Sequence, residues 1–236
     1  MSSTNEQLST HRITEPGIKR LVISDLHIGS KFYKSNELLR LLETEEFDEL
    51  VLAGDIIDFI KIPSFTIACA KLINSFAKNK SIKYIIGNHD ISFEKWNGLQ
   101  VCGVTFLRHY EFKCGNRRFF ITHGDLYERG LVRFRFVMKV ISIFHDILER
   151  WLNTDLTTFF HDKFQGSPRI QKIKKLLSQT DTDVFIMGHN HSPEAIIWVN
   201  EDLEIKTYVN SGDWVSHSTY VTIDPDGQVR LRKFNA

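Results

Sequence analysis

Histidine, aspartate and asparagine gather in five short clusters along this chain. The clusters are Asp25-x-His27, Gly54-Asp55-x-x-Asp58, Gly87-Asn88-His89-Asp90, His123-Gly124-Asp125 and Gly188-His189-x-His191. Imidazole and carboxylate groups are ligands for zinc, manganese and iron, and one carboxylate can bridge two ions. Two ions about 3.5–4 Å apart can activate a water molecule and hold the oxygens of a phosphoryl group during in-line displacement. The residue types therefore indicate a two-metal hydrolytic site.

A short apolar run precedes each cluster. The runs are Arg20–Ser24, Leu50–Ala53, Lys83–Ile86, Arg118–Thr122 and Asp183–Met187. Short apolar strands that alternate with helices are typical of an α/β protein with a mainly parallel sheet. Ligands of such sheets bind beyond the carboxyl ends of the strands. We therefore expect all five clusters to lie along one rim.

The remaining elements predict a second sheet. Helices are expected over residues 36–46 and 64–78. From Glu194 onward the pattern changes to strands, expected over 195–199, 205–209, 219–223 and 229–234, with a hairpin turn at Asp226-Gly227. We predict an α/β fold in which two β-sheets pack as a sandwich flanked by helices.

The composition limits the class of protein. Of the 236 residues, 42% are hydrophobic and 25% are charged, and the formal net charge is +1. These values exclude a mostly disordered or fibrous chain, and no nucleic-acid partner is expected from bulk charge. Three cysteines without a C-x-x-C pair favour a reducing compartment.

Nothing in the sequence predicts secretion or a membrane span. Residues 1–17 contain no apolar core of a signal peptide, and no apolar run approaches the ~20 residues that span a bilayer. We expect a cytoplasmic protein, with at most peripheral contact with the inner face of the cytoplasmic membrane. The oligomeric state is left open.

The chain divides into a tail and one domain with an insert. Residues 1–17 are expected to form a flexible polar tail, and residues 18–236 the domain, with a helical cap inserted at about 126–182. Within the insert, residues 129–152 interleave arginines with apolar side chains, and the apolar face is broader than a helix on a core usually needs. This stretch is either a helical hairpin with a solvated basic face or a cap that contacts lipid.

In their order and spacing, the five clusters resemble the motif set of the calcineurin-like metallophosphoesterases, over about residues 20–191. The resemblance implies two divalent ions, with manganese expected and zinc or iron as alternatives. It implies the following roles: Asp25, His27 and His191 hold the first ion; Asn88, His123 and His189 hold the second; Asp55 bridges both; His89 contacts phosphate and protonates the leaving oxygen; and Asp90 orients the His89 imidazole.

Three further segments resemble the UDP-2,3-diacylglucosamine diphosphatase family, namely 25–29, 54–58 and 210–215, the last followed by Thr219-Tyr-Val. That family carries a helical insert in the same place. The resemblance implies a UDP-sugar lipid substrate in the lipid A pathway, hydrolysed at its pyrophosphate to UMP and a lipid sugar 1-phosphate. The implied substrate contacts are Asn88, His89, Arg129, Arg133, Phe134 and Phe136, with arginines for phosphates and apolar side chains for acyl chains.

One position departs from that family. Its best-known members have Arg where this chain has His89, and the histidine form is the general phosphoesterase pattern. Two other functions therefore stay open: hydrolysis of a soluble nucleotide or other phosphoester, and a metal-bound scaffold that recruits partners through the cap.

Two residues near the clusters have two interpretations each. Asp58 is either a carboxylate that supports a ligand or a helix N-terminal residue, and Asp125 is either a turn residue or a similar support. His217 lies outside the motifs, but it follows Gly212-Asp213-Trp214, which is expected to border the site.

Overall fold

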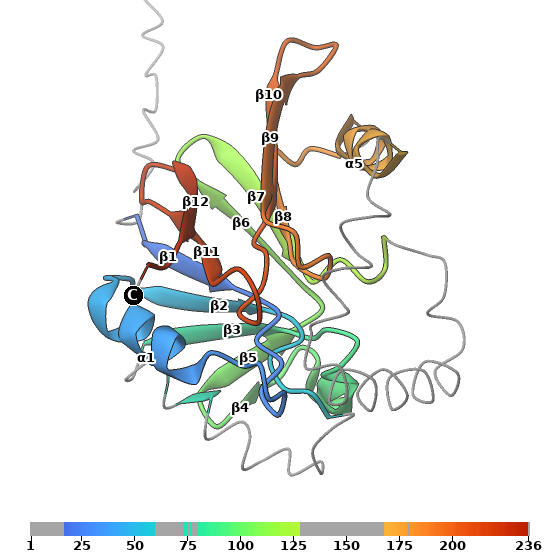
Figure 1. The fold of residues 1–236 in the computed structure, drawn as a ribbon. Helices are drawn as coiled ribbons and strands as arrows, with labels where there is room; N and C mark the ends of the chain where they lie inside the picture. Colours follow the sequence, from blue (N-terminus) through green and yellow to red (C-terminus); the bar gives the residue numbers. More distant parts are fainter. Residues whose placement is uncertain are drawn as a thin grey trace, which may run out of the picture.

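The computed structural model describes residues 17–59, 73–74, 76, 80–127, 168–178 and 180–235. Two β-sheets stack on one another, with helices on their outer faces (Figure 1). Apolar side chains from both sheets form one shared core, which includes Val22 and Val51 of the first sheet and Ile121 and Ile186 of the second. The predicted two-sheet α/β fold is confirmed.

The first sheet has seven strands in the order β12-β11-β1-β2-β3-β5-β4. Strands β1, β2, β3 and β5 run parallel, and the other three join antiparallel. The strands are β1 (Arg20–Ile23), β2 (Glu49–Ala53), β3 (Ser81–Ile85), β4 (Gln100–Val101), β5 (Val104–Leu107), β11 (Thr219–Ile223) and β12 (Val229–Lys233).

The second sheet has five strands in the order β6-β7-β8-β10-β9. Strands β7, β8 and β10 run parallel, and β6 and β9 are antiparallel edges. The strands are β6 (His109–Cys114), β7 (Arg117–Thr122), β8 (Val184–Met187), β9 (Glu194–Val199) and β10 (Ile205–Asn210).

Helices cover the outer face of each sheet. On the first sheet, α1 (Ser35–Thr44) buries Leu38, Leu41 and Leu42, which share one helix face because they are three and four residues apart. The short 3₁₀ helix η1 (Ile91–Trp96) adds the buried ring of Phe93 to the same core. On the second sheet, α5 (Pro168–Ser178) packs against the rings of β8 and β10.

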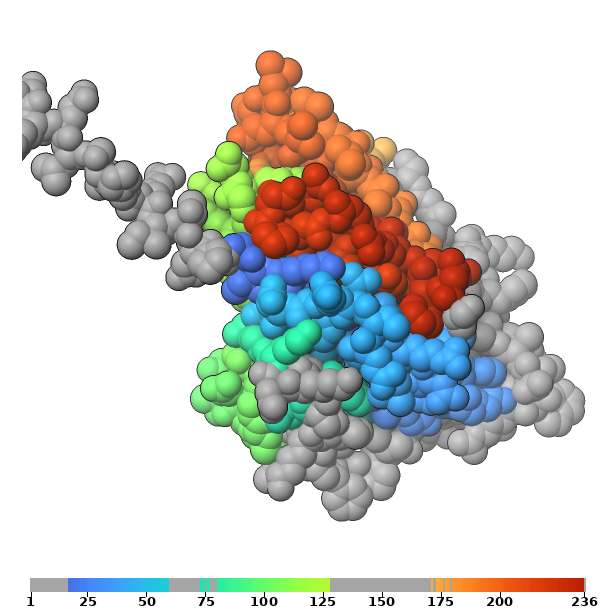
Figure 2. Space-filling model, turned by 90° about the vertical axis from the view of Figure 1, so that its left-hand side faces the viewer, coloured from blue at the N-terminus to red at the C-terminus, as the bar shows by residue number. Residues whose placement is uncertain are grey.

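The order of the strands differs from the order of the chain. Strand β11 pairs with β1, so the C-terminal hairpin β11–β12 returns to the first sheet instead of extending the second. Figure 2 shows this red C-terminal segment lying between the blue β1 region and the orange β9–β10 region. The pairing brings residues 211–218, which precede β11, back to the end of β1.

Strands β4, β5 and β6 were not expected. Strand β4 has only two residues, and β6 alternates polar and apolar side chains at a sheet edge, with none of the apolar continuity of a central strand. Of the expected helix over 64–78, only Ile73, Asn74 and Phe76 are described, and these three are helical.

The expected tail and most of the expected insert lie outside the described residues. Those residues include the proposed substrate contacts Arg129, Arg133, Phe134 and Phe136, and the stretch 129–152 as a whole. In the described part of the chain, no helix is both long and apolar enough to cross a membrane.

Candidate active site

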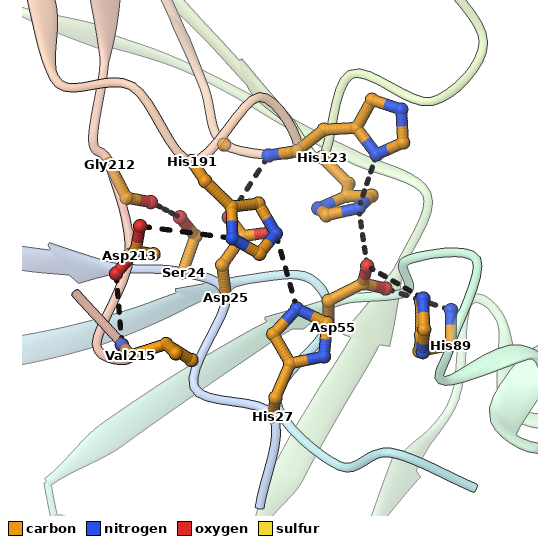
Figure 3. Close-up of polar contacts among 12 residues, drawn as sticks. Ser24, Asp25, His27, Asp55, His89, His123, His191, Gly212, Asp213 and Val215 are labelled. Atoms are coloured by element: carbon orange, nitrogen blue, oxygen red, sulfur yellow. Dashed lines mark hydrogen bonds and ion pairs between the residues drawn. The ribbon is translucent and has the colours of Figure 1, made fainter. Parts of the chain in front are cut away.

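All five clusters follow the carboxyl ends of strands, namely β1, β2 and β3 of the first sheet and β7 and β8 of the second. Backbone hydrogen bonds join the loops: Asp25 N–H donates to the Gly54 carbonyl at 3.0 Å, and Gly188 N–H donates to the His123 carbonyl at 3.1 Å. A third bond crosses between the sheets, from His189 N–H to Asp25 Oδ2 at 3.0 Å. The clusters therefore meet at one rim, as Figure 3 shows.

The backbone turns sharply at the predicted metal-site residues. Five of them have a positive φ angle between 48° and 69°: Asp25, His27, Asp55, His189 and His191. A left-handed conformation is uncommon for residues other than glycine and costs on the order of 1–3 kcal/mol each. The surrounding loops maintain this strain, and it points the five side chains back over the ends of their strands.

Two glycines allow the loops to approach one another. A Cβ atom on Gly87 would lie 2.2 Å from Asp55 Oδ1, and a Cβ atom on Gly188 would lie 2.3 Å from Asp25 Oδ2. Any other residue would push the neighbouring carboxylate away. The glycines of G-N-H-D and G-H-x-H therefore make room for ligands that belong to other loops.

The first group of candidate ligands contains Asp25, His27 and His191, whose ligand atoms lie within 4.8 Å of one another. His191 Nε2 is 3.3 Å from His27 Nε2 and 3.4 Å from Asp25 Oδ1. Asp25 is fully buried and His27 nearly so. These are the residues that the sequence analysis assigned to the first ion.

The second group contains Asp55, His123 and His189. His123 Nε2 lies 3.1 Å from Asp55 Oδ2, 3.2 Å from Asn88 Oδ1 and 3.3 Å from His189 Nδ1. The other ring nitrogen of His123 donates a hydrogen bond to the Ala53 carbonyl at 3.0 Å, which leaves Nε2 facing the group. All four residues assigned to the second ion or to the bridge are thus brought together.

The charges of the second group are strongly coupled. Burial alone would raise the pKa of Asp55, but His123 and His89 overcome it and lower that pKa well below its usual value. Burial would likewise lower the histidine pKa values, but chiefly Asp55 raises the pKa of His123 to about 10 and that of His89 to about 9. Without a metal ion, protons on these histidines balance the buried carboxylate.

The first group is shifted in the opposite direction. Burial raises the pKa of Asp25, and burial together with His89 and His191 lowers the pKa of His27 well below its usual value. In the second group, burial likewise lowers the pKa of His189, to about 3, so the two histidines of that group shift in opposite directions. Neutral imidazoles beside carboxylates are the donor set that binds divalent transition metals, so the residues fit two such ions.

Comparisons with known proteins agree with this geometry. Residues 18–193 match the family model described as calcineurin-like phosphoesterase. The chain belongs to this family. Among curated protein sequences, none matches it significantly.

Two solved structures of low sequence identity have a fold similar to that of this chain. Vps29 from Chaetomium thermophilum has 13% identity and a TM-score of 0.52, covering 91% of this chain and 96% of its own. Vacuolar Protein Sorting 29 from Cryptosporidium parvum has 14% identity and a TM-score of 0.50, with coverages of 94% and 100%. A predicted phosphoesterase from Streptococcus pneumoniae has 15% identity and a TM-score of 0.45, with coverages of 93% and 91%.

The structure corrects the role assigned to Asp90. Its carboxylate accepts hydrogen bonds from the backbone N–H groups of Ile56, Ile57 and Gly87, at 2.9 to 3.3 Å, so it ties two loops together. The His89 imidazole instead donates from Nδ1 to Asp58 Oδ1 at 3.1 Å. Asp58, in the loop after β2, is therefore the carboxylate that contacts this imidazole.

The sequence left the role of Asp58 undecided, and the structure places this carboxylate beside His89 and His27. It is fully buried, and its second oxygen lies 4.0 Å from His27 Nδ1. The contact with His89 Nδ1 leaves Nε2 of that ring on the side of Asp55, at 4.0 Å from Oδ2. Asp58 therefore holds the His89 ring with one nitrogen directed at the centre of the site.

Sequence reasoning did not identify Asp213, which is fully buried beside the site. One carboxylate oxygen accepts hydrogen bonds from the N–H groups of Val215, Ser216 and His217. The other accepts a hydrogen bond from His217 Nδ1 at 2.8 Å and lies 3.7 Å from His191 Nδ1. The Gly-Asp-Trp segment was the only sequence signal for it.

Asp125 lies in the turn after β7, where burial raises its pKa.

Proposed function

We propose that this phosphoesterase uses two divalent metal ions to hydrolyse the pyrophosphate of a lipid resembling UDP-2,3-diacylglucosamine. The oxygen of water would bond to the uridylyl phosphorus, and the bond from that phosphorus to the oxygen of the sugar phosphate would break. One water is consumed, and UMP and the lipid sugar 1-phosphate are released.

The observation that carries the hydrolytic part is the convergence at one rim of largely buried aspartates and histidines, in groups whose ligand atoms lie within 4.8 Å of one another. Asp25, His27 and His191 would hold one ion, and Asn88, His123 and His189 the other, with Asp55 between the groups. When bound, such ions lower the pKa of water and neutralise charge on phosphate oxygens. We propose manganese, with zinc and iron as alternatives, because imidazole and carboxylate groups are ligands for all three metals.

His89 is the group of the chain that we propose as the proton donor. Asp58 holds its Nδ1, and its pKa is raised to about 9 despite the opposing effect of burial, chiefly because of Asp55. A protonated imidazole at neutral pH can give its proton to the departing oxygen, and protonation of that oxygen lowers the barrier to bond cleavage.

Support for the lipid substrate comes from the segments shared with the diacylglucosamine diphosphatases. One of them, residues 210–215, forms the loop after β10 that contacts the ends of β1 and β8: Trp214 N–H donates to the Asp25 carbonyl, and Ser211 N–H donates to the Met187 carbonyl. We propose that Arg129 and Arg133 bind phosphate or an anionic membrane surface, and that Phe134 and Phe136 bind acyl chains.

A soluble nucleotide or another phosphoester is the second candidate, and His89 favours it. An imidazole with one nitrogen held by a carboxylate is a general acid that serves any phosphoester, whereas the arginine found in the best-known diphosphatases binds two phosphates at once.

Manganese-supplemented hydrolysis of UDP-2,3-diacylglucosamine in detergent, beside bis-p-nitrophenyl phosphate, separates the candidates. Fast UMP release supports the lipid substrate. Turnover of the aryl ester alone retains the two-metal chemistry and favours the second candidate. Bound metal without turnover of either substrate would favour a scaffold.

The cap is tested by replacing Phe134 and Phe136 with Ser. We expect a raised KM for the lipid and an unchanged KM for the aryl ester. Leu203→Ser is the matched control, because Leu203 is 84% exposed in the β9–β10 turn. An equal loss on both substrates would argue against an acyl-binding cap.

A further inference from the structure

His191 is held between two carboxylates that come from different strands. Its Nε2 faces Asp25 and His27, and its Nδ1 faces Asp213 Oδ2 at 3.7 Å. Figure 3 shows the His191 ring between Asp213 and His27. Because one nitrogen faces the candidate ligand group, the nitrogen opposite it is the one that Asp213 can influence.

The position of Asp213 is itself strongly constrained. Its Oδ1 accepts N–H bonds from Val215 at 2.9 Å and from His217 at 3.1 Å, and the side chain is completely buried. The loop around it is anchored to the end of β1, because Ser24 Oγ, in the residue after that strand, donates a hydrogen bond to the Gly212 carbonyl at 3.1 Å. The carboxylate therefore stays in place whichever way the ring of His191 turns.

We infer that Asp213 is a positioning residue for the first metal ion and acts through His191. When Nε2 of a histidine binds a metal ion, the ring proton must be on Nδ1, and a carboxylate beside Nδ1 favours that tautomer and that ring orientation. Asp213 is the carboxylate in this place. The inference rests on the proposed two-metal function but not on the identity of the phosphoester.

A manganese titration of the metal-stripped protein tests this inference. The titration runs up to millimolar manganese, and electron paramagnetic resonance measures the concentration of free ion. We expect Asp213→Asn to bind one of the two ions about 10–100-fold more weakly than wild type. His217→Ala is the matched control, because it removes another partner of the same carboxylate oxygen and leaves the His191 side chain in the protein. That control should change either affinity by less than about twofold.

A double-mutant cycle separates positioning from loop structure. In a His191→Ala background, Asp213→Asn should weaken manganese binding no further. If the same 10–100-fold loss appears in that background, Asp213 acts through the loop, which also contacts Asp25, and the inference is wrong. Wild-type affinity in the single variant would overturn it as well. Failure of the wild-type protein to bind any metal would instead refute the proposed function.

A measurement on the unaltered protein covers the case in which Asp213→Asn does not fold. In the zinc-loaded wild-type protein, ¹⁵N NMR of the histidine rings should show His191 with its proton on Nδ1, assigned by its loss in His191→Ala. A proton on Nε2 would contradict the inference.

Discussion

The aspartates in the two halves of the site have opposite pKa shifts, although each half pairs one aspartate with two histidines. Each half contains one aspartate and two histidines, all largely buried. In the first half, burial raises the pKa of Asp25 and lowers that of His27. In the second half, the pKa of Asp55 falls well below its usual value and that of His123 rises to about 10, although burial opposes both shifts.

The difference comes from the balance between burial, which raises the pKa of each carboxylate, and the charge of the nearby histidines, which lowers it. Asp55 lies 3.1 Å from His123 and 4.0 Å from His89, so two imidazoles can be charged against it. At Asp25, His191 at 3.4 Å also lowers the pKa, but desolvation by burial dominates. The same ligand types therefore give the two carboxylates different pKa values. A metal ion entering the second half must displace protons, and its affinity there should depend more on pH.

The largest effect is expected from replacing Asp55, which we propose to lie between the two metal ions. Asp55→Ala should reduce turnover of bis-p-nitrophenyl phosphate by more than the roughly 10²–10⁴-fold expected for loss of a general acid, and lower the metal content measured by mass spectrometry. The control is Asp202→Ala, at an exposed position in the β9–β10 turn. Normal turnover by Asp55→Ala would refute its bridging role.

The next effect concerns the histidine outside both groups of three. His89→Gln should lower kcat by about 10²–10⁴-fold and retain both metal ions, because the variant loses a proton donor but no ligand. His109→Gln on β6, with a side chain 54% exposed, is the control. Loss of metal from His89→Gln would show that the residue is structural instead.

A smaller effect distinguishes the two aspartates beside His89. Asp58→Asn should lower kcat by about 10-fold or more with little change in melting temperature, because it weakens the orientation of the imidazole. Asp90→Asn should mainly reduce stability, by about 1–3 kcal/mol, because the amide NH2 that replaces one carboxylate oxygen cannot accept, which leaves at least one buried backbone N–H group without an acceptor. Thermal melts and kinetics of both variants, measured together, would reveal the reverse assignment if it held.

The smallest effect is the pH dependence of stability in the metal-free protein. His89 and His123 have folded-state pKa values of about 9 and about 10, above the ordinary value of 6.5, so between pH 7 and 9 the folded state binds more protons than the unfolded state. The two protonated histidines stabilise the folded state fully below pH 6.5, and this stabilisation is lost as pH rises through about 9 and about 10. Each extra proton gives a slope of about 1.4 kcal/mol per pH unit.

Denaturant melts between pH 7.5 and 8.5 measure that slope. His89→Gln should about halve it, and loading with manganese should remove most of it. A slope of zero in the metal-free protein would show that the two halves do not differ in charge as described.

Much of this architecture follows from local sequence. The central strands β1, β2 and β8 are continuous apolar runs, and the change to strands after Glu194 predicted the second sheet. The edge strand β6 was not predicted, because a half-exposed edge alternates polar and apolar side chains and lacks a continuous run. The pairing of β11 with β1 was not predicted either, because register between distant strands depends on long-range packing.

For the site, the sequence by itself determined which residues serve as candidate ligands, because each follows the end of an apolar strand within four residues. Only the tertiary structure decided their supports and their charges. Asp58, not Asp90, holds His89, and Asp213 faces His191 across 22 residues of chain. Such contacts depend on distances between loops, and the pKa shifts depend on burial and on neighbouring charges, which exist only once the two sheets have packed together.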